Sequence, residues 1–284
     1  MVGQGDNTYA RILSSIPLIT LVVACLYYGN IYFLILCSII GALIAYEATV
    51  LLLNKNKKII AFSTSLTIFS ITITLSLNVD LLFPLILGII GLISISLLLL
   101  IHRNGYSLSR FITLLILLSV SLLFSISAIW LRDEPFGLAI IIWLCAVVWG
   151  TDIGAYFFGR TLKGPRLAPY ISPSKTLSGA FGGIFTAIIL SIVCGVIGRE
   201  TNIISSEISF FYFIFAGLGF SIIAQIGDLL ESSLKRYVGV KDTGNIIPGH
   251  GGVMDRADSL VFSTLCLSLI AVVAGSELIE WLIP

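Results

Sequence analysis

Residues 31–53 read IYFLILCSIIGALIAYEATVLLL, a run of 23 residues in which Glu47 is the only charged side chain. A helix needs about 20 apolar residues to cross a hydrocarbon core roughly 30 Å thick. This stretch is therefore long enough to cross a membrane, and similar runs recur along the whole chain.

The composition agrees with repeated membrane crossing. Of the 284 residues, 57% are hydrophobic and 11% are charged, whereas soluble domains are about half apolar and about a quarter charged. The net charge of +1 provides no global field for nucleic acid. The sequence predicts a multi-pass membrane protein, with the lipid bilayer as a partner and no nucleic-acid partner.

Every backbone polar group inside a bilayer must be satisfied within the protein. The apolar runs are too long and too uniform for the strands of a membrane barrel, so an all-α, polytopic fold with about nine transmembrane helices is expected. The expected spans are residues 11–28, 31–53, 58–77, 81–101, 111–130, 137–157, 177–198, 208–230 and 258–280.

The basic residues divide unequally between the two sides of this arrangement. Only Arg132 and Arg199 fall on one side, and the other 14 of the 16 Lys and Arg residues fall on the opposite side. Cytoplasmic loops carry such an excess. We therefore expect a protein of the cytoplasmic membrane whose chemistry faces the cytoplasm.

Two regions are expected along the chain. Residues 1–136 form an N-terminal region of about five spans, and residues 137–284 form a C-terminal catalytic region. The longest polar segments, 159–176 and 231–257, are predicted to be cytoplasmic loops of the second region.

One helix face near the end of the eighth span concentrates polar groups. Asp228, Glu231, Ser232 and Lys235 are spaced at i, i+3, i+4 and i+7, which places them on one stripe of a helix. Such groups are costly at a membrane interface unless they are paired or used. The alternative is a solvated helix end in which Glu231 pairs with Lys235.

The segment that follows is rich in glycine and ends in two acids. It contains Lys241-Asp242-Thr243-Gly244, then Pro248-Gly249-His250-Gly251-Gly252, then Asp255-Arg256-Ala257-Asp258. Glycine lets backbone N–H groups approach an anion closely, and two carboxylates one helical turn apart suit Mg²⁺. The alternative is that Asp255 caps a helix and Asp258 is an ordinary first-turn acid.

Three further ionisable residues stand out in or beside the apolar runs. Asp152, near the cytoplasmic end of a span, is a functional candidate or makes an internal hydrogen bond. His250 lies between glycines and is a candidate phosphate contact or proton donor, although a lone histidine is more often a surface residue. Glu47 has no motif around it and is interpreted as structural or as lining a polar cavity.

A second polar loop contributes a cation. Residues 171–176 read ISPSKT and precede Gly179, Gly182 and Gly183 at the start of the seventh long span. The start of that helix is a natural site for an anion beside Lys175. The small residues serve equally well for close helix packing.

The pattern from Ser232 to Asp258 resembles the signature of phosphatidate cytidylyltransferases, also called CDP-diacylglycerol synthases. It comprises SxLKR at 232–236, Lys241-Asp242 and PxHGGxxDRxD at 248–258. The segment Ser172-Pro173-x-Lys175-Thr176-x-x-Gly179 is similar to a second motif of that family. Two departures are Ala257, where a larger aliphatic residue is usual, and Leu177-Ser178, where Trp-Glu is common.

This resemblance implies an enzyme that transfers a cytidylyl group from CTP to phosphatidate and releases pyrophosphate. It implies Mg²⁺, a second cation such as K⁺, and a homodimer. Metal ligands would be Asp228, Asp255 and Asp258, with Asp152 as a further candidate. The expected catalytic residues are Asp228, Ser232, Lys235, Asp255 and Asp258. The expected substrate-binding residues are Lys175, Arg236, Lys241, His250, Gly251, Gly252 and Arg256.

Two other functions remain open on the sequence alone. A kinase or cytidylyltransferase that uses CTP and acts on an isoprenoid lipid would have a similar site. A transporter could use Glu47 and Asp152 in an ion pathway, but no internal repeat supports it and the polar residues gather at one face of the membrane.

Overall fold

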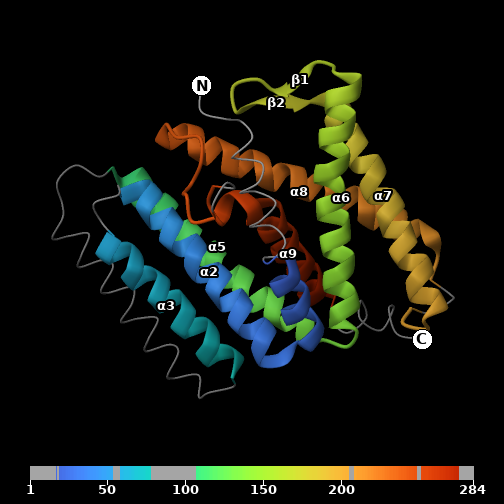
Figure 1. The fold of residues 1–284 in the computed structure, drawn as a ribbon, viewed down its shortest axis with the longest axis horizontal. Coiled ribbons are helices and arrows are strands. Elements are labelled where there is room, and N and C mark those ends of the chain that lie inside the picture. The colour runs from blue at the N-terminus through green and yellow to red at the C-terminus, as the bar shows by residue number, and fades with distance from the viewer. Residues whose placement is uncertain are drawn as a thin grey trace. The chain divides into compact units, whose positions relative to one another are not determined.

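The computed structural model describes residues 17, 19–53, 58–77, 107–204, 208–247 and 251–274. Helices dominate this part of the chain (Figure 1). The elements are α2 (Asn30–Leu53), α3 (Lys58–Ser76), α5 (Leu108–Asp133), α6 (Gly137–Leu162), β1 (Arg166–Ala168), β2 (Ser172–Thr176), α7 (Leu177–Glu200), α8 (Phe210–Val238) and α9 (Met254–Ala274).

Seven of these helices are long and apolar enough to cross a membrane, which confirms the all-α, polytopic fold. They correspond to seven of the nine expected spans. A shorter apolar helix, Ile19–Tyr28, lies within the first expected span. The expected span at 81–101 lies outside the described residues.

The two predicted cytoplasmic loops are shorter than expected because the helices continue past their apolar runs. Helix α6 extends to Leu162, α8 extends to Val238, and α9 begins at Met254. Hydropathy marks where a helix leaves the membrane, whereas the helix itself ends where its backbone hydrogen bonds end.

A small β-hairpin, which the sequence did not lead us to expect, occupies most of the first polar segment. Strand β1 pairs antiparallel with β2, with Arg166 opposite Thr176 and Ala168 opposite Ser172. Thr176 ends the hairpin and also caps α7, since its hydroxyl accepts a hydrogen bond from the N–H of Gly179 at 3.1 Å. The hairpin therefore leads directly into a helix.

The chain divides into two compact units. The first contains residues 1–130 and 238–257, and the second contains residues 131–237 and 258–284. The expected division into an N-terminal region at 1–136 and a C-terminal catalytic region at 137–284 stays a prediction.

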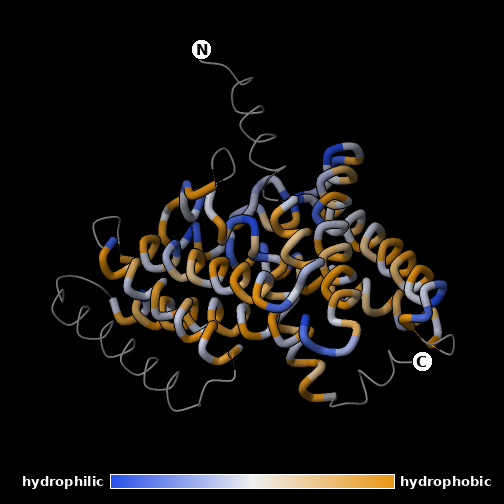
Figure 2. Tube along the Cα trace, turned by 60° about the horizontal axis from the view of Figure 1, so that its bottom comes forward, coloured by the Kyte–Doolittle hydropathy of each residue, from blue (hydrophilic) through white to orange (hydrophobic). Residues whose placement is uncertain are grey.

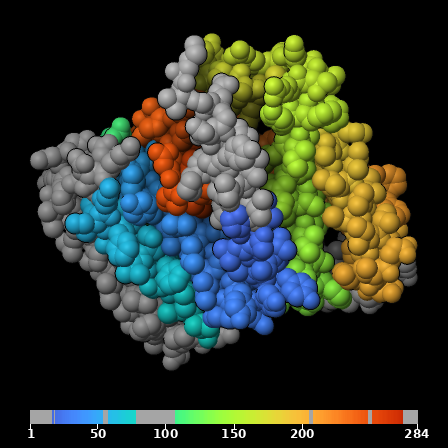
Figure 3. All heavy atoms as spheres, viewed as in Figure 1, coloured from blue at the N-terminus to red at the C-terminus, as the bar shows by residue number. Residues whose placement is uncertain are grey.

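In the first unit, α3 lies along α2 (Figures 1 and 3). The hydroxyl of Thr49 on α2 is 3.0 Å from that of Thr64 on α3. Helix α5 packs against α2 at Gly41, and the hydroxyl of Ser125 donates to the carbonyl of Cys37 at 3.0 Å. Small residues and hydroxyl groups thus hold these apolar helices together.

In the second unit, glycines allow α6 and α7 to approach closely. A methyl group added at Gly154 of α6 would lie 2.7 Å from the backbone oxygen of Gly182 on α7. Hydroxyl groups connect further helices, because Thr151 donates to Ser221 at 3.0 Å and Ser191 donates to the carbonyl of Phe213 at 2.7 Å. These contacts reach α8 at Phe213 and Ser221, which precede the polar stripe that begins at Asp228.

The outer faces of the helices carry large apolar side chains that a membrane would cover. Phe181 is 70% exposed and Phe215 is 66% exposed. Hydrophobic residues run along the helices, and hydrophilic residues gather mainly near helix ends and in the connecting segments (Figure 2). Exposed apolar surface on this scale marks contact with lipid or protein.

We expect Gly154→Ala to destabilise the protein and Gly219→Ala to leave it as stable or more stable. The same methyl group meets the backbone of α7 at position 154 but has nothing within 4 Å at position 219 of α8. Overpacking costs about 1–3 kcal/mol, whereas alanine favours a helix over glycine by about 1 kcal/mol. Thermal unfolding in detergent measures both variants, and equal melting temperatures would contradict close packing at Gly154.

Candidate active site

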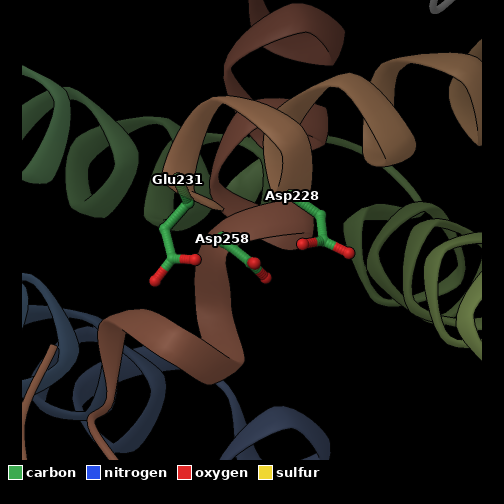
Figure 4. Close-up of side chains that lie close together, drawn as sticks. All are labelled: Asp228, Glu231 and Asp258. Carbon is green, nitrogen blue, oxygen red and sulfur yellow. The ribbon is translucent and has the colours of Figure 1, made fainter. Parts of the chain in front are cut away.

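Three carboxylates converge in the second unit (Figure 4). Asp228 and Glu231 lie three residues apart on α8, and Asp258 lies on the second turn of α9. One oxygen from each lies within 4.8 Å of the other two. The stripe on α8 is therefore completed by an acid from another helix.

Two lysines balance this negative charge. The ammonium of Lys235 lies 2.5 Å from Glu231 on the same helix, as the i, i+4 spacing predicts. The ammonium of Lys175 forms an ion pair with Asp228. Glu231 therefore pairs with Lys235 and also belongs to the acidic cluster, so the two readings of that residue are compatible.

The β-hairpin positions Lys175 beside α8. Strand β2 carries the lysine, and the guanidinium of Arg236 donates from Nε to the carbonyl of Ile171 at 3.2 Å. Thr176, the residue that follows Lys175, is held in place because it caps α7. Arg236 thus contacts the hairpin, and its predicted role in binding substrate stays a prediction.

The cluster is closed on one side and accessible on the other. The side chain of Glu231 is 2% exposed, whereas those of Lys175 and Asp228 are 24% and 30% exposed. The buried charge of Glu231 is compensated by the ammonium of Lys235. Small molecules or ions would therefore reach the cluster past Asp228 and Lys175.

Nearby groups orient the remaining oxygens. The Ser232 hydroxyl lies 3.4 Å from Asp228 Oδ1, to which it donates. The Ser259 N–H donates to Asp258 Oδ1 at 2.7 Å. The charges of Asp152 and Lys235 also act on Asp258, so Asp152 lies near the cluster without being one of the three converging acids.

The chemistry of this donor set suits a hard divalent cation. Carboxylate oxygens are the ligands that Mg²⁺ prefers, usually one or two of them together with substrate phosphates. The adjacent lysines suit phosphate oxygens. The cluster can thus bring a metal ion and a phosphate group to the same place.

Asp255 organises the glycine-rich segment in the first unit. Its carboxylate accepts hydrogen bonds from the N–H of Thr243 at 3.0 Å and from the N–H of Gly252 at 2.8 Å. Gly251 has a φ of +89°, a conformation that favours glycine. The N–H of Gly252, which we expected to face a substrate anion, therefore donates to the carboxylate of Asp255.

The other predicted residues of this segment differ in their exposure. Lys241 and Arg256 are exposed, as contact with a soluble anion requires. His250 lies outside the described residues. The predicted roles of Gly251, Gly252 and Asp255 with substrate or metal stay predictions. Each oxygen of the Asp255 carboxylate has two lone pairs, so the hydrogen bonds that it accepts are compatible with metal binding.

Sequence reasoning left two residues out of the site. The spacing places Glu231 on the polar stripe, with a pair to Lys235 as the alternative, but it is not among the residues predicted to be catalytic or to bind metal. Glu47 was considered structural or part of a polar cavity. Its carboxylate binds the glycine-rich segment more than 190 positions away, and no local pattern signals such a partner.

The model of the cytidylyltransferase family matches residues 9–274. The chain belongs to this family. The match covers most of both units and includes the acidic cluster and the glycine-rich segment.

Several relatives carry the name phosphatidate cytidylyltransferase. The one from Brucella suis biovar 1 (strain 1330) is 47% identical over 142 residues, which cover 48% of each chain. The one from Bacillus subtilis (strain 168) is 43% identical over 129 residues, 45% of this chain and 46% of the relative. The aligned part of this cytidylyltransferase thus spans about half the length of the curated relatives it matches.

We expect the cluster to bind Mn²⁺, a paramagnetic substitute for Mg²⁺, without nucleotide. Asp258→Asn removes one of three carboxylates and should weaken binding at least about tenfold, a loss seen even for outer partners of metal ligands. Electron paramagnetic resonance titration of the protein in detergent measures the affinity. Glu200→Gln, an exposed acid at the end of α7, is the control; equal losses in both variants would contradict a metal site at the cluster.

Proposed function

We propose that the protein is a phosphatidate cytidylyltransferase, which makes CDP-diacylglycerol and pyrophosphate from CTP and phosphatidate. The observation that carries the proposal is the convergence of Asp228, Glu231 and Asp258 beside two lysines in a member of the cytidylyltransferase family. The names of the relatives support phosphatidate as the lipid acceptor.

The residues present fit a Mg²⁺ ion, which Asp228, Glu231 and Asp258 would hold. The metal-binding role of Asp255 stays a prediction. When bound, the ion supplies positive charge that neutralises phosphate oxygens and makes the α-phosphorus of CTP more open to attack. A second cation such as K⁺ remains a prediction, for which Asp152 is a nearby carboxylate.

The reaction asks for positioning and charge neutralisation rather than a protein nucleophile. An oxygen of the phosphatidate phosphate forms a bond to the α-phosphorus of CTP. The bond from that phosphorus to the bridging oxygen breaks, and the oxygen leaves with pyrophosphate. The protein must therefore hold two polyanions together.

Lys175 and Lys235 are suited to that task. Each ammonium can donate to phosphate oxygens while it remains close to a carboxylate of the cluster. Lys175 is the more exposed of the two, and we assign it to the incoming substrate. Lys235 keeps Glu231 neutralised, and Ser232 orients Asp228 and offers its hydroxyl to a substrate phosphate.

The glycine-rich segment is assigned to CTP. Lys241 and Arg256 are exposed cations of this segment, and we propose that they contact phosphate groups of CTP. The substrate-binding roles of Arg236, His250, Gly251 and Gly252 stay predictions. The exposed positions and the flexible geometry of glycine support this assignment.

The site is proposed to face the cytoplasm from the cytoplasmic membrane. The basic residues of the connecting segments support this orientation through their excess on one side. The substrates support it as well, since CTP is soluble and phosphatidate lies in the leaflet. The homodimer implied by the family resemblance stays a prediction.

Purified protein incubated with cytidine-labelled CTP, phosphatidate and Mg²⁺ should yield a labelled lipid and pyrophosphate. A parallel incubation replaces phosphatidate with an isoprenoid alcohol or its phosphate. If only the isoprenoid lipid becomes labelled, the acceptor is an isoprenoid lipid and not phosphatidate. If neither lipid becomes labelled, the protein is not a lipid cytidylyltransferase.

Asp228→Asn and Asp258→Asn should each lower kcat by about a hundredfold or more, the range found when one electrostatic contact to a transition state is removed. The same steady-state assay measures both variants, with size-exclusion chromatography to confirm folding. Asp133→Asn, at the end of α5, is the matched control. Normal turnover by folded Asp228→Asn or Asp258→Asn protein would remove that residue from the catalytic site.

A further inference from the structure

Glu47 is an ionisable residue that the proposed reaction does not use. It lies on α2, a helix long and apolar enough to cross a membrane, and is 2% exposed. Burial of a carboxylate in such a setting is costly unless hydrogen bonds compensate it. The reason for its presence must lie in what it contacts.

Within the described residues, the hydrogen bonds that Glu47 accepts from other elements come from the glycine-rich segment of the first unit. Oε1 accepts a hydrogen bond from the N–H of Val253 at 2.9 Å. Oε2 accepts one from the N–H of Met254 at 2.8 Å and one from the hydroxyl of Thr243 at 3.2 Å. Together, the two carboxylate oxygens bind both ends of the segment, Thr243 at one end and Val253 and Met254 at the other.

Two of these donors belong to the start of a helix. Helix α9 begins at Met254, and the first N–H groups of a helix have no partner within it. A negative charge at this end is also favoured by the helix dipole. Glu47 thus caps α9 from a different helix.

Glycines give the segment room to close around this carboxylate. A methyl group added at Gly252 would lie 2.6 Å from Glu47 Oε2, and one added at Gly244 would lie 2.7 Å from Oε1. No side chain fits at either distance without movement. Contact with Glu47 therefore explains why glycine occupies positions 244 and 252, in addition to any contact with substrate.

We propose that Glu47 is a positioning residue that fixes Thr243, Val253 and Met254, the described residues at the two ends of the glycine-rich segment, so that this segment binds CTP. This inference rests on the function proposed above. Through this contact, the N-terminal helices take part in the reaction without supplying a group that touches substrate. Asp255 complements it, because its carboxylate accepts from the N–H groups of Thr243 and Gly252 and lies in the first turn of α9.

The decisive variant is Glu47→Gln, which keeps the size of the side chain. An amide offers one acceptor and one donor group, so it cannot accept from both N–H groups at once through its two ends. We expect hydrogen exchange in peptides covering 243–256 to accelerate about tenfold or more, and the Kd for CTP in the presence of Mg²⁺ to rise about tenfold. These changes correspond to the loss of a hydrogen bond to a charged group.

Thr49→Val is the matched control. Thr49 lies two residues further along α2, is fully buried, and hydrogen bonds to Thr64 rather than to the segment. This variant should lower the melting temperature without changing exchange in 243–256 or the Kd for CTP. A merely structural role for Glu47 would make the two variants behave alike.

A double-mutant cycle with Thr243→Val adds a second test. Because Thr243 donates to Glu47, the effects of Glu47→Gln and Thr243→Val on the Kd for CTP should be less than additive in the double variant. Additive effects would overturn the proposal. So would unchanged exchange in folded Glu47→Gln protein, or faster exchange with an unchanged Kd.

The inference and the proposed function fail in different ways. Wild-type protein that transfers no cytidylyl group to phosphatidate would overturn the proposed function alone, because exchange and CTP binding do not depend on turnover. Active wild-type protein whose Glu47→Gln variant binds CTP normally would overturn the role of Glu47 alone.

Discussion

Carboxylates among apolar helices need compensation, and this constraint shapes both units of the protein. Glu231 is matched by Lys235, and Asp228 is matched by Lys175. Glu47 has no lysine in its described contacts and is matched by two backbone N–H groups and a hydroxyl. Each acid is therefore stabilised by a partner from a defined element, and these partners determine where the hairpin and the glycine-rich segment lie.

Close packing of the helices makes these arrangements precise. Glycines at the contact of α6 and α7 let the two backbones approach, and hydroxyl groups such as Thr151 and Ser221 connect α6 to α8. Near the polar stripe itself, Gly227 of α8 lies against Phe262 of α9. A metal site needs its oxygens at fixed separations, and this contact holds together the two helices that supply them.

Hydropathy and motif spacing predicted a large part of this structure. Seven expected spans correspond to helices because an apolar run of 20 residues has few alternatives in a bilayer. The stripe on α8 followed from the helical period. The pairing of Lys175 with Asp228 could not be predicted, because it depends on a short hairpin and joins residues more than 50 positions apart. Glu47 was harder still: its partner Val253 lies 206 positions away, and neither residue belongs to a local pattern that indicates the other.

Asp255 and Asp258 show why one motif can serve two tasks. They are three residues apart at the start of α9, and their spacing alone suggests a shared ligand. The chain leaves the second unit at Tyr237, contributes 238–257 to the first unit, and returns at Asp258. Asp255 accordingly binds the backbone of the glycine-rich segment, whereas Asp258 joins Asp228 and Glu231. Regular spacing on one helix therefore does not by itself assign two carboxylates to the same ligand, because the partners that each one meets are set by other elements of the chain.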